Sequence, residues 1–148
     1  MRSKMGLETR TATFPVSPEV MWSYFEQPQS WPEWDPDIVG VSETAQPGVA
    51  EGTAWDIEML NPKTGKLEFS QVEPGKAFIW RVIALGGAMQ GVGHFSFEPA
   101  HSGAHTKFTY EFQMNGLLGK PLWLLARSTV VKGVDGGMGN IATQFSSS

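Results

Sequence analysis

Aromatic and charged side chains alternate along the middle of this chain, and this alternation limits the fold more than any other feature. In residues 53–60, large apolar side chains occupy every second position, and Asp56 and Glu58 lie between them. Side chains with a period of two point to opposite faces of a β-strand, so one face meets a core and the other meets water. The apolar positions of this pattern are Trp55, Ile57, Met59, Phe78, Trp80, Val82, Phe95, Phe97, Phe108, Tyr110, Phe112 and Met114.

Turn-forming residues separate these segments at short intervals. Pro74 and Gly75 form one such break, and Gly86 and Gly87 form the next. Strands joined by turns of this kind are typical of an antiparallel meander. We expect seven strands, or six if the second segment is irregular. The predicted strands cover residues 7–14, 38–43, 53–60, 66–73, 76–85, 90–98 and 105–115.

Two short helices are predicted after the first strand. Ser17 and Pro18 fit the N-cap and first position of a helix over residues 18–26. A serine side chain at the N-cap accepts a hydrogen bond from one of the free backbone N–H groups of the first turn. Proline is tolerated at the first helical position, because the N–H that it lacks would have no partner in the helix. Helical spacing gives this segment one apolar face, so we expect Trp22 to be buried.

The second helix is predicted to be very short. Ser30 and Glu33 have the spacing of a capping box, in which each side chain bonds the other residue's backbone N–H. Trp34 follows directly, and we expect it to be buried with Trp22, so that the two helices are fixed against the sheet.

The last segment changes to helical spacing, which predicts a long helix that begins near Pro121. Four glycines interrupt it, and each costs about 0.8–1 kcal/mol relative to alanine. Glycines let a helix either approach a sheet closely or bend. We interpret residues 133–139 as a flexible gate, because residues 123–131 carry enough apolar surface to anchor the first half. The glycines are Gly133, Gly136, Gly137 and Gly139.

The order of these elements predicts an α+β fold. We expect a curved antiparallel sheet of six to seven strands that grips the long C-terminal helix, with two short helices after the first strand and an internal cavity. Residues 1–148 are expected to form a single domain, in which 1–6 and 146–148 are flexible tails.

Two motifs carry a resemblance to a known family. The first reads Ser-Pro-Glu-Val-Met-Trp over 17–22, followed by Trp-Pro-Glu-Trp-Asp-Pro over 31–36. The second reads Phe-Ile-Trp-Arg over 78–81, followed by Gly-His-Phe-Ser-Phe-Glu-Pro over 93–99. With the closing helix, they resemble the polyketide cyclase/dehydrase branch of the START-like superfamily (SRPBCC, the birch-pollen-allergen-like helix-grip fold). The resemblance covers essentially the whole chain and departs mainly in the glycines of the final helix.

The resemblance implies a cavity between the aromatic face of the sheet and the C-terminal helix; without it, this face is ordinary core. Ligand pockets are mostly apolar with a few polar groups, here the Tyr110 hydroxyl and the Trp55 and Trp80 indole N–H groups. Arg127 would reach the cavity and pair with a ligand's carboxylate or enolate, or it is an exposed arginine. The candidate ligand-binding residues are Trp55, Ile57, Trp80, Phe95, Tyr110, Phe112, Trp123, Arg127, Val130 and Met138.

Composition and motifs exclude several functions. The chain has no cysteine, which removes disulfides and cysteine-based zinc sites, and its net charge of −4 argues against binding to nucleic acid. No nucleotide-binding glycine motif or nucleophile elbow occurs. We therefore expect no cofactor and no metal, and catalytic residues remain unassigned.

The positions of the ionisable residues favour solvent exposure or turn formation over catalysis or metal binding. Asp56 and Glu58 share the solvent face of a strand, and His94 has the same outward parity. Asp35 and Asp37 flank a proline, which is typical of turn and capping chemistry. The two remaining histidines lie in a hairpin loop without the carboxylates that a metal site needs.

Two functions remain open. The first is a carrier or sensor that binds a small hydrophobic or aromatic molecule. The second is a polyketide cyclase or dehydratase-like enzyme, which a buried ionisable side chain with a shifted pKa would favour. We expect a cytoplasmic protein, monomeric or a weak homodimer, without a membrane span.

Overall fold

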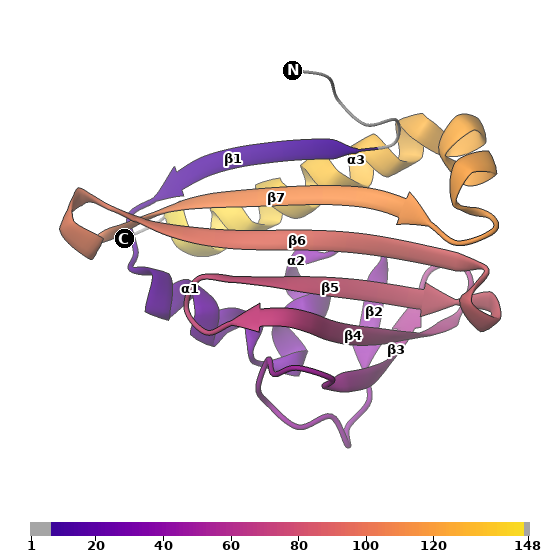
Figure 1. Cartoon of the computed structure of the whole chain (residues 1–148), viewed down its shortest axis with the longest axis horizontal. Coiled ribbons are helices and arrows are strands. Elements are labelled where there is room, and N and C mark those ends of the chain that lie inside the picture. Colours follow the sequence, from indigo (N-terminus) through magenta and orange to yellow (C-terminus); the bar gives the residue numbers. More distant parts are fainter. Residues whose placement is uncertain (1–6, 147–148) are drawn as a thin grey trace.

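Seven antiparallel strands form one sheet, and helices cover one of its faces (Figure 1). In the computed structural model, which describes residues 7–146, the strand order is β1-β7-β6-β5-β4-β3-β2. The prediction of a seven-stranded α+β fold with two short helices and a long C-terminal helix is confirmed. The elements are β1 (Glu8–Phe14), α1 (Pro18–Phe25), η1 (Pro28–Ser30), α2 (Trp31–Trp34), β2 (Ile38–Val41), β3 (Ala54–Met59), β4 (Thr64–Glu73), β5 (Ala77–Ala84), η2 (Leu85–Gly87), β6 (Met89–Ala100), η3 (His101–Gly103), β7 (His105–Asn115) and α3 (Gly119–Ser146).

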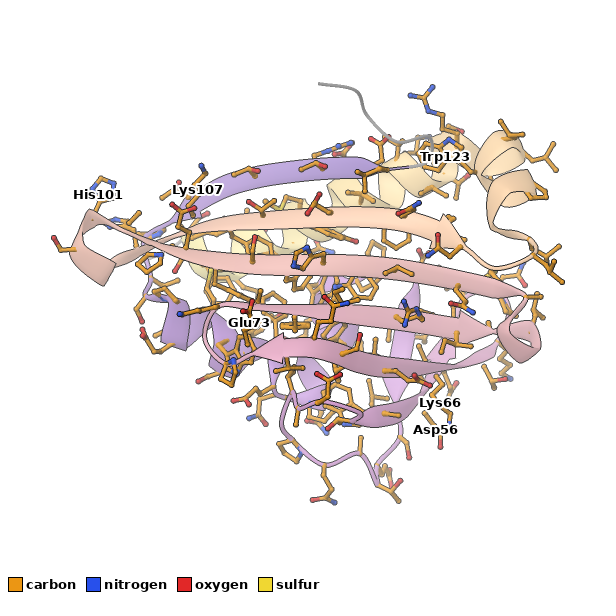
Figure 2. All side chains as sticks on the ribbon, in the orientation of Figure 1. Asp56, Lys66, Glu73, His101, Lys107 and Trp123 are labelled. Carbon is orange, nitrogen blue, oxygen red and sulfur yellow. The ribbon has the colours of Figure 1, made fainter. Side chains whose placement is uncertain are left out.

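The two faces of the sheet have the composition that the alternation predicts. On the inner face, Phe95 lies opposite Phe78 of β5 and Tyr110 of β7, and all three are buried. On the outer face, Figure 2 shows Asp56 and Lys66, whose side chains form an exposed ion pair of 3.6 Å. The aromatic face therefore meets α1, α2 and α3, and the charged face meets water.

The first helix begins as its sequence predicts. Ser17 is extended, and its hydroxyl accepts a hydrogen bond from the backbone N–H of Val20 at 3.4 Å. The burial prediction for the two indoles is confirmed, because Trp22 is 8% exposed and Trp34 is fully buried.

The predicted capping box before α2 is wrong. Ser30 has helical dihedral angles, and its hydroxyl donates to the carbonyl of Gln27 at 2.8 Å. Glu33 accepts from the Tyr24 hydroxyl at 3.1 Å. The physical reason is that η1 runs directly into α2, so Ser30 is already helical and cannot adopt the extended conformation of an N-cap.

The long helix α3 has one break, at Ala126, where φ is −125° and ψ is 26°. Before the break, Leu124 and Leu125 are 66% and 87% exposed. After it, Val134 and Ile141 are buried against the sheet. Trp123 is buried in the first part, so both parts of α3 contact the core, and the second part buries more apolar side chains than the sequence led us to expect.

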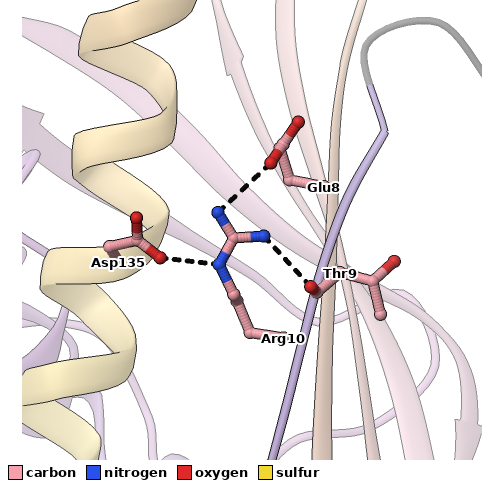
Figure 3. A network of polar contacts seen from close by, with 4 residues as sticks. All are labelled: Glu8, Thr9, Arg10 and Asp135. Atoms are coloured by element: carbon pink, nitrogen blue, oxygen red, sulfur yellow. Dashed lines mark hydrogen bonds and ion pairs between the residues drawn. The ribbon is translucent and has the colours of Figure 1, made fainter.

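Polar contacts fix the second part of α3 at two more points. The Arg10 side chain of β1 donates to Asp135 at 2.6 Å and also bonds Glu8 and the carbonyl of Thr9 (Figure 3). The Asn140 amide donates to the carbonyl of Trp34 at 3.0 Å. These bonds connect α3 to the sheet edge and to the end of α2.

The glycines of α3 lie where the helix meets the chain segment 34–37. A Cβ on Gly137 would stand 3.3 Å from two ring carbons of Trp34, and one on Gly136 would stand 3.3 Å from Pro36. A Cβ on Gly133 would stand 3.5 Å from a carboxylate oxygen of Asp37, which is an ordinary contact distance. At Gly136 and Gly137 the missing side chains thus allow close approach, whereas no atom lies within 4 Å of a Cβ on Gly139. Close packing therefore accounts for these two glycines, and the flexible gate over residues 133–139 stays a prediction.

The ends of the chain add two observations. Of the tails predicted over residues 1–6 and 146–148, residues 1–6 and 147–148 lie outside the described residues, and Ser146 is the last residue of α3. Among the described helices, none is long and apolar enough to cross a membrane.

Candidate functional site

A pocket of about 220 Å³ lies between the aromatic face of the sheet and α3. Strands β5, β6 and β7 supply one wall, and the part of α3 around its break supplies the other. The chain that follows α2 closes one end with two carboxylates. The lining residues are Asp35, Asp37, Ile38, Met59, Asn61, Trp80, Val82, Met89, Gly91, Tyr110, Phe112, Met114, Ala126, Thr129, Val130, Gly133 and Val134.

Glycines in β6 give the aromatic wall its shape. Gly93 pairs with Trp80 of β5, and a Cβ at this position would stand 2.0 Å from the indole ring. Gly91 has the same relation to Phe112, at 3.0 Å. A glycine inside a strand often marks such a close approach. The two aromatic side chains can therefore lie across β6 because β6 presents no side chains there.

Three aromatic rings of this wall lie close together. The ring centroids of Trp80 and Tyr110 are 6.0 Å apart, and those of Trp80 and Phe112 are also 6.0 Å apart. The third pair, Tyr110 and Phe112, is separated by 6.4 Å. The rings are inclined to one another, with interplanar angles of 48°, 38° and 86° in the same order, so the pocket offers a ligand an apolar wall of tilted rings.

Asp35 and Asp37 form the polar end of the pocket. Asp35 is 8% exposed, and its carboxylate accepts a hydrogen bond from the backbone N–H of Asp37 at 2.9 Å. This bond is the turn chemistry that the sequence predicts. The burial of the same carboxylate beneath α3 was not predicted.

Burial changes the ionisation of this end of the pocket. Loss of solvation raises the pKa of Asp35 from its usual 3.8 to about 7, and the neighbouring charge of Asp37 acts in the same direction. The hydrogen bond from the Asp37 N–H opposes the rise in the Asp35 pKa. Burial also raises the pKa of Asp37. For Tyr110, burial and then the charges of the two carboxylates raise the pKa of the phenol. Asp35 can therefore hold or release a proton near neutral pH.

Two buried indole N–H groups near the pocket lack a hydrogen-bond partner among the described residues. They belong to Trp34 and Trp80, which are almost completely buried. An unpaired buried donor costs free energy, so such groups usually indicate a ligand, an ordered water or local strain.

The structure places four of the ten candidate residues in the pocket wall, namely Trp80, Tyr110, Phe112 and Val130. The others lie elsewhere. Trp55, Ile57 and Phe95 are buried in the core, and the Trp55 indole donates to the carbonyl of Gln46. Met138 packs against the core from α3.

Trp123 and Arg127 lie at the start of α3. The Arg127 guanidinium stands 5.8 Å from the ring centroid of Trp123, and the Arg127 side chain is exposed. Neither residue lines the pocket, which agrees with the alternative interpretation of Arg127 as an exposed arginine. Their contact with a ligand stays a prediction.

Sequence reasoning missed the acidic end and the glycines of β6. Gly91 and Gly93 carried a usable signal, because isolated glycines in a strand pattern predict a close approach. Asp35 and Asp37 carried a weaker signal for burial. Asp35 lies between two large apolar residues, Trp34 and Ile38, and both of these are buried.

The remaining candidates stay on the surface. His94 lies on the outer face, 3.3 Å from Glu111, and the His101 and His105 rings meet edge to face at the η3 turn. Within the described part of the chain, no three metal-ligating side chains come together. A larger hollow of about 1040 Å³ is lined by residues that include the exposed Asp56, Glu58 and Lys66 of the outer face. It is therefore separate from the apolar pocket between the sheet and α3.

Solved structures share this fold at low sequence identity. Protein CV1439 from Chromobacterium violaceum superimposes with a TM-score of 0.70 at 10% identity, over 97% of this chain and 99% of that one. Ara h 8.0201 gives a TM-score of 0.65 at 14% identity, over 93% and 95%. The di-domain ARO/CYC StfQ from the steffimycin biosynthetic pathway gives 0.60 at 14% identity, over 91% of this chain and 48% of that one.

These likenesses show the fold alone. No curated protein matches the sequence. Residues 7–146 match the model of a family described as polyketide cyclase / dehydrase and lipid transport. Because this match spans nearly the whole chain and agrees with the motifs over 17–36 and 78–99, the chain belongs to the polyketide cyclase / dehydrase and lipid transport family, within the SRPBCC superfamily.

Proposed function

We propose that the protein binds a small hydrophobic or aromatic molecule in the pocket beneath α3, as a carrier or sensor. The observation that carries this proposal is the pocket itself, with an aromatic wall of Trp80, Tyr110 and Phe112 and a few polar lining residues, among them Asp35 and Asp37. Ligand sites in proteins have this composition. The family description, which includes lipid transport, supports the same function.

The size of the pocket limits the ligand. A dry cavity of about 150 Å³ holds benzene, and typical ligand pockets measure about 300–1,000 Å³. At about 220 Å³ the pocket lies between these values. We therefore expect a ligand close to a single substituted ring in size, rather than a fused polycycle.

A pocket-filling substitution tests this function. In the Val130→Phe variant a larger side chain occupies the pocket, whereas Val131→Phe places the same side chain at a neighbouring position that does not line it. We expect simple phenols to quench tryptophan emission of the parent and of Val131→Phe with micromolar to millimolar affinity. Val130→Phe should lose this response. A panel of small aromatics that leaves the parent's emission and heat of mixing unchanged would refute the binding function.

Asp35 supports a second candidate, a cyclase or dehydratase-like enzyme. A buried carboxyl group with a pKa of about 7 in an apolar pocket meets the requirement for a general acid or base. The Tyr110 phenol is a further candidate for supporting an enolate oxygen. Deuterium incorporation into small cyclic ketones in D₂O, followed by NMR, separates the two functions. An enzyme should accelerate this exchange and lose the acceleration in Asp35→Asn, whereas a carrier should not accelerate it.

A further inference from the structure

We propose that the ligand of this pocket carries a positively charged amine, which Asp35 and Asp37 hold at the edge of the aromatic wall. This inference rests on the proposed binding function and names the class of ligand: a small aromatic or apolar ammonium compound.

The charged side chains that line the pocket are all acidic. Its lining contains two carboxylates, and none of the described lining residues is Lys, Arg or His. The basic residue that acts on the phenol of Tyr110 is Arg10, and Asp135 and Glu8 already bond its guanidinium. Buried carboxylates are normally paired with a cation or with several donors. A cation from a ligand would supply the pairing that the described chain does not.

The carboxylates have acceptor capacity to spare. An ionised carboxylate accepts up to four hydrogen bonds. Asp35 receives one, from the backbone N–H of Asp37 at 2.9 Å. The Asp37 carboxylate lies beneath α3, and one of its oxygens stands 3.5 Å from the place where a Gly133 side chain would begin. Glycine at this position leaves the carboxylate uncovered on that side.

Tyr110 is an independent observation that points to a ligand. Its side chain is 3% exposed and lines the pocket, yet no hydrogen bond joins its hydroxyl to any described residue. Asp35 and Asp37 line the same pocket, and after burial their charges raise the pKa of this phenol. A ligand ammonium at this point would have the phenol oxygen and the carboxylates as acceptors together.

The aromatic wall suits the same cation. The rings of Trp80, Tyr110 and Phe112 lie within 6.4 Å of one another, centroid to centroid. A cation close to such ring faces is attracted by their negative centres, and aromatic walls are a common means of binding ammonium groups. An anionic ligand of the same size would meet the two carboxylates without any compensating charge.

Three probes of nearly equal size test the inference: benzylamine, benzyl alcohol and benzoate, titrated by calorimetry at pH 8, where the amine is protonated. We expect the amine to bind about tenfold more tightly than the alcohol, because hydrogen bonds to charged groups are stronger than neutral ones. Benzoate should show no binding. The variants Asp35→Asn and Asp37→Asn keep the side-chain shape, and each should reduce the preference for the amine at least fivefold while the alcohol affinity stays within twofold.

Asp56→Asn is the matched control, because it removes the same charge from the outer face and should leave the preference unchanged. Circular dichroism establishes that each variant is folded; if Asp35→Asn does not fold, Asp37→Asn and Tyr110→Phe carry the test. Equal affinity for amine and alcohol, or an equal loss of preference in Asp56→Asn, would overturn the amine inference and leave the proposed binding function intact. Binding of none of the three probes would overturn both.

Discussion

Replacing Asp35 by Asn should stabilise the protein relative to the parent, and this gain in unfolding free energy should be larger at alkaline pH than at acidic pH. Asn keeps the acceptor for the Asp37 N–H, so the turn is preserved. What changes is the ionisation. Burial raises the pKa of Asp35 from 3.8 to about 7, so the folded state of the parent holds a proton that the unfolded state releases at lower pH.

The sign and size follow from this difference. Below about pH 4 the group is protonated in both states and costs nothing. Between about pH 4 and 7 the folded parent binds more protons than the unfolded chain, so its unfolding free energy falls as pH rises, and above pH 7 the loss is complete. A difference of about three units between the folded and unfolded pKa values of Asp35 corresponds to a loss of about 4 kcal/mol of unfolding free energy. About 2–3 kcal/mol of this loss falls between pH 5 and pH 8.

Urea denaturation at pH 5 and pH 8 measures the effect. The stability of Asp35→Asn minus that of the parent should be about 2–3 kcal/mol larger at pH 8 than at pH 5. Asp56→Asn, which changes an exposed carboxylate, should show a difference below about 0.5 kcal/mol between the two pH values. If Asp35→Asn also shows no pH-dependent difference, the carboxyl group ionises normally and the description of a buried acidic end is wrong.

Three further substitutions test the packing. Gly93→Ala should destabilise the protein by at least about 1–3 kcal/mol in urea denaturation, because the added Cβ would stand 2.0 Å from the buried Trp80 ring; an unchanged midpoint would contradict this. Gly139→Ala should stabilise α3 by about 0.5–1 kcal/mol, because nothing lies near the new Cβ, whereas Gly137→Ala should lose this gain against the Trp34 ring. Equal melting temperatures for these two variants would show that the glycines are not there for close packing. Trp34→Ala should cost about 3–5 kcal/mol, and a loss below about 1 kcal/mol would refute its place in the core.

The sheet was predictable because its signal is local and repeated. Each strand carries the alternation in its own sequence, as β7 does with Phe108 and Tyr110 on the buried face and Lys107 on the exposed one. The order of β3 to β7 then follows from short turns, whereas the pairing of β1 with β7 joins strands that are distant in the sequence. The positions of the helices were predictable for the same reason, since their spacing and the N-cap of α1 lie within a few residues, although the capping box predicted for α2 was wrong.

The acidic end of the pocket was not predictable in this way. Asp35 and Asp37 form a turn by local chemistry, and their burial depends on α3, which crosses them about a hundred residues later. The bond from Asn140 to the carbonyl of Trp34 spans 106 positions. Such a contact leaves no mark in the local pattern.

The break in α3 was also hidden. Ala126 is of the residue type with the highest helix propensity, and the glycines that suggested a bend lie further on. The role of Gly136 and Gly137 became clear only from what stands opposite them, because a Cβ on either residue would stand 3.3 Å from the segment 34–37.

The methionine methyl groups test the central claim, that the pocket beneath α3 receives a ligand, most directly. Met59, Met89 and Met114 line the pocket, whereas Met21 of α1 is fully buried and does not line it. Protein labelled with ¹³C at the methionine methyl groups is titrated with benzylamine and followed by NMR. We predict saturable shifts for the three pocket methyl groups and none for Met21. Methyl signals that stay unchanged up to millimolar ligand, or that shift equally for all four residues, would contradict the account.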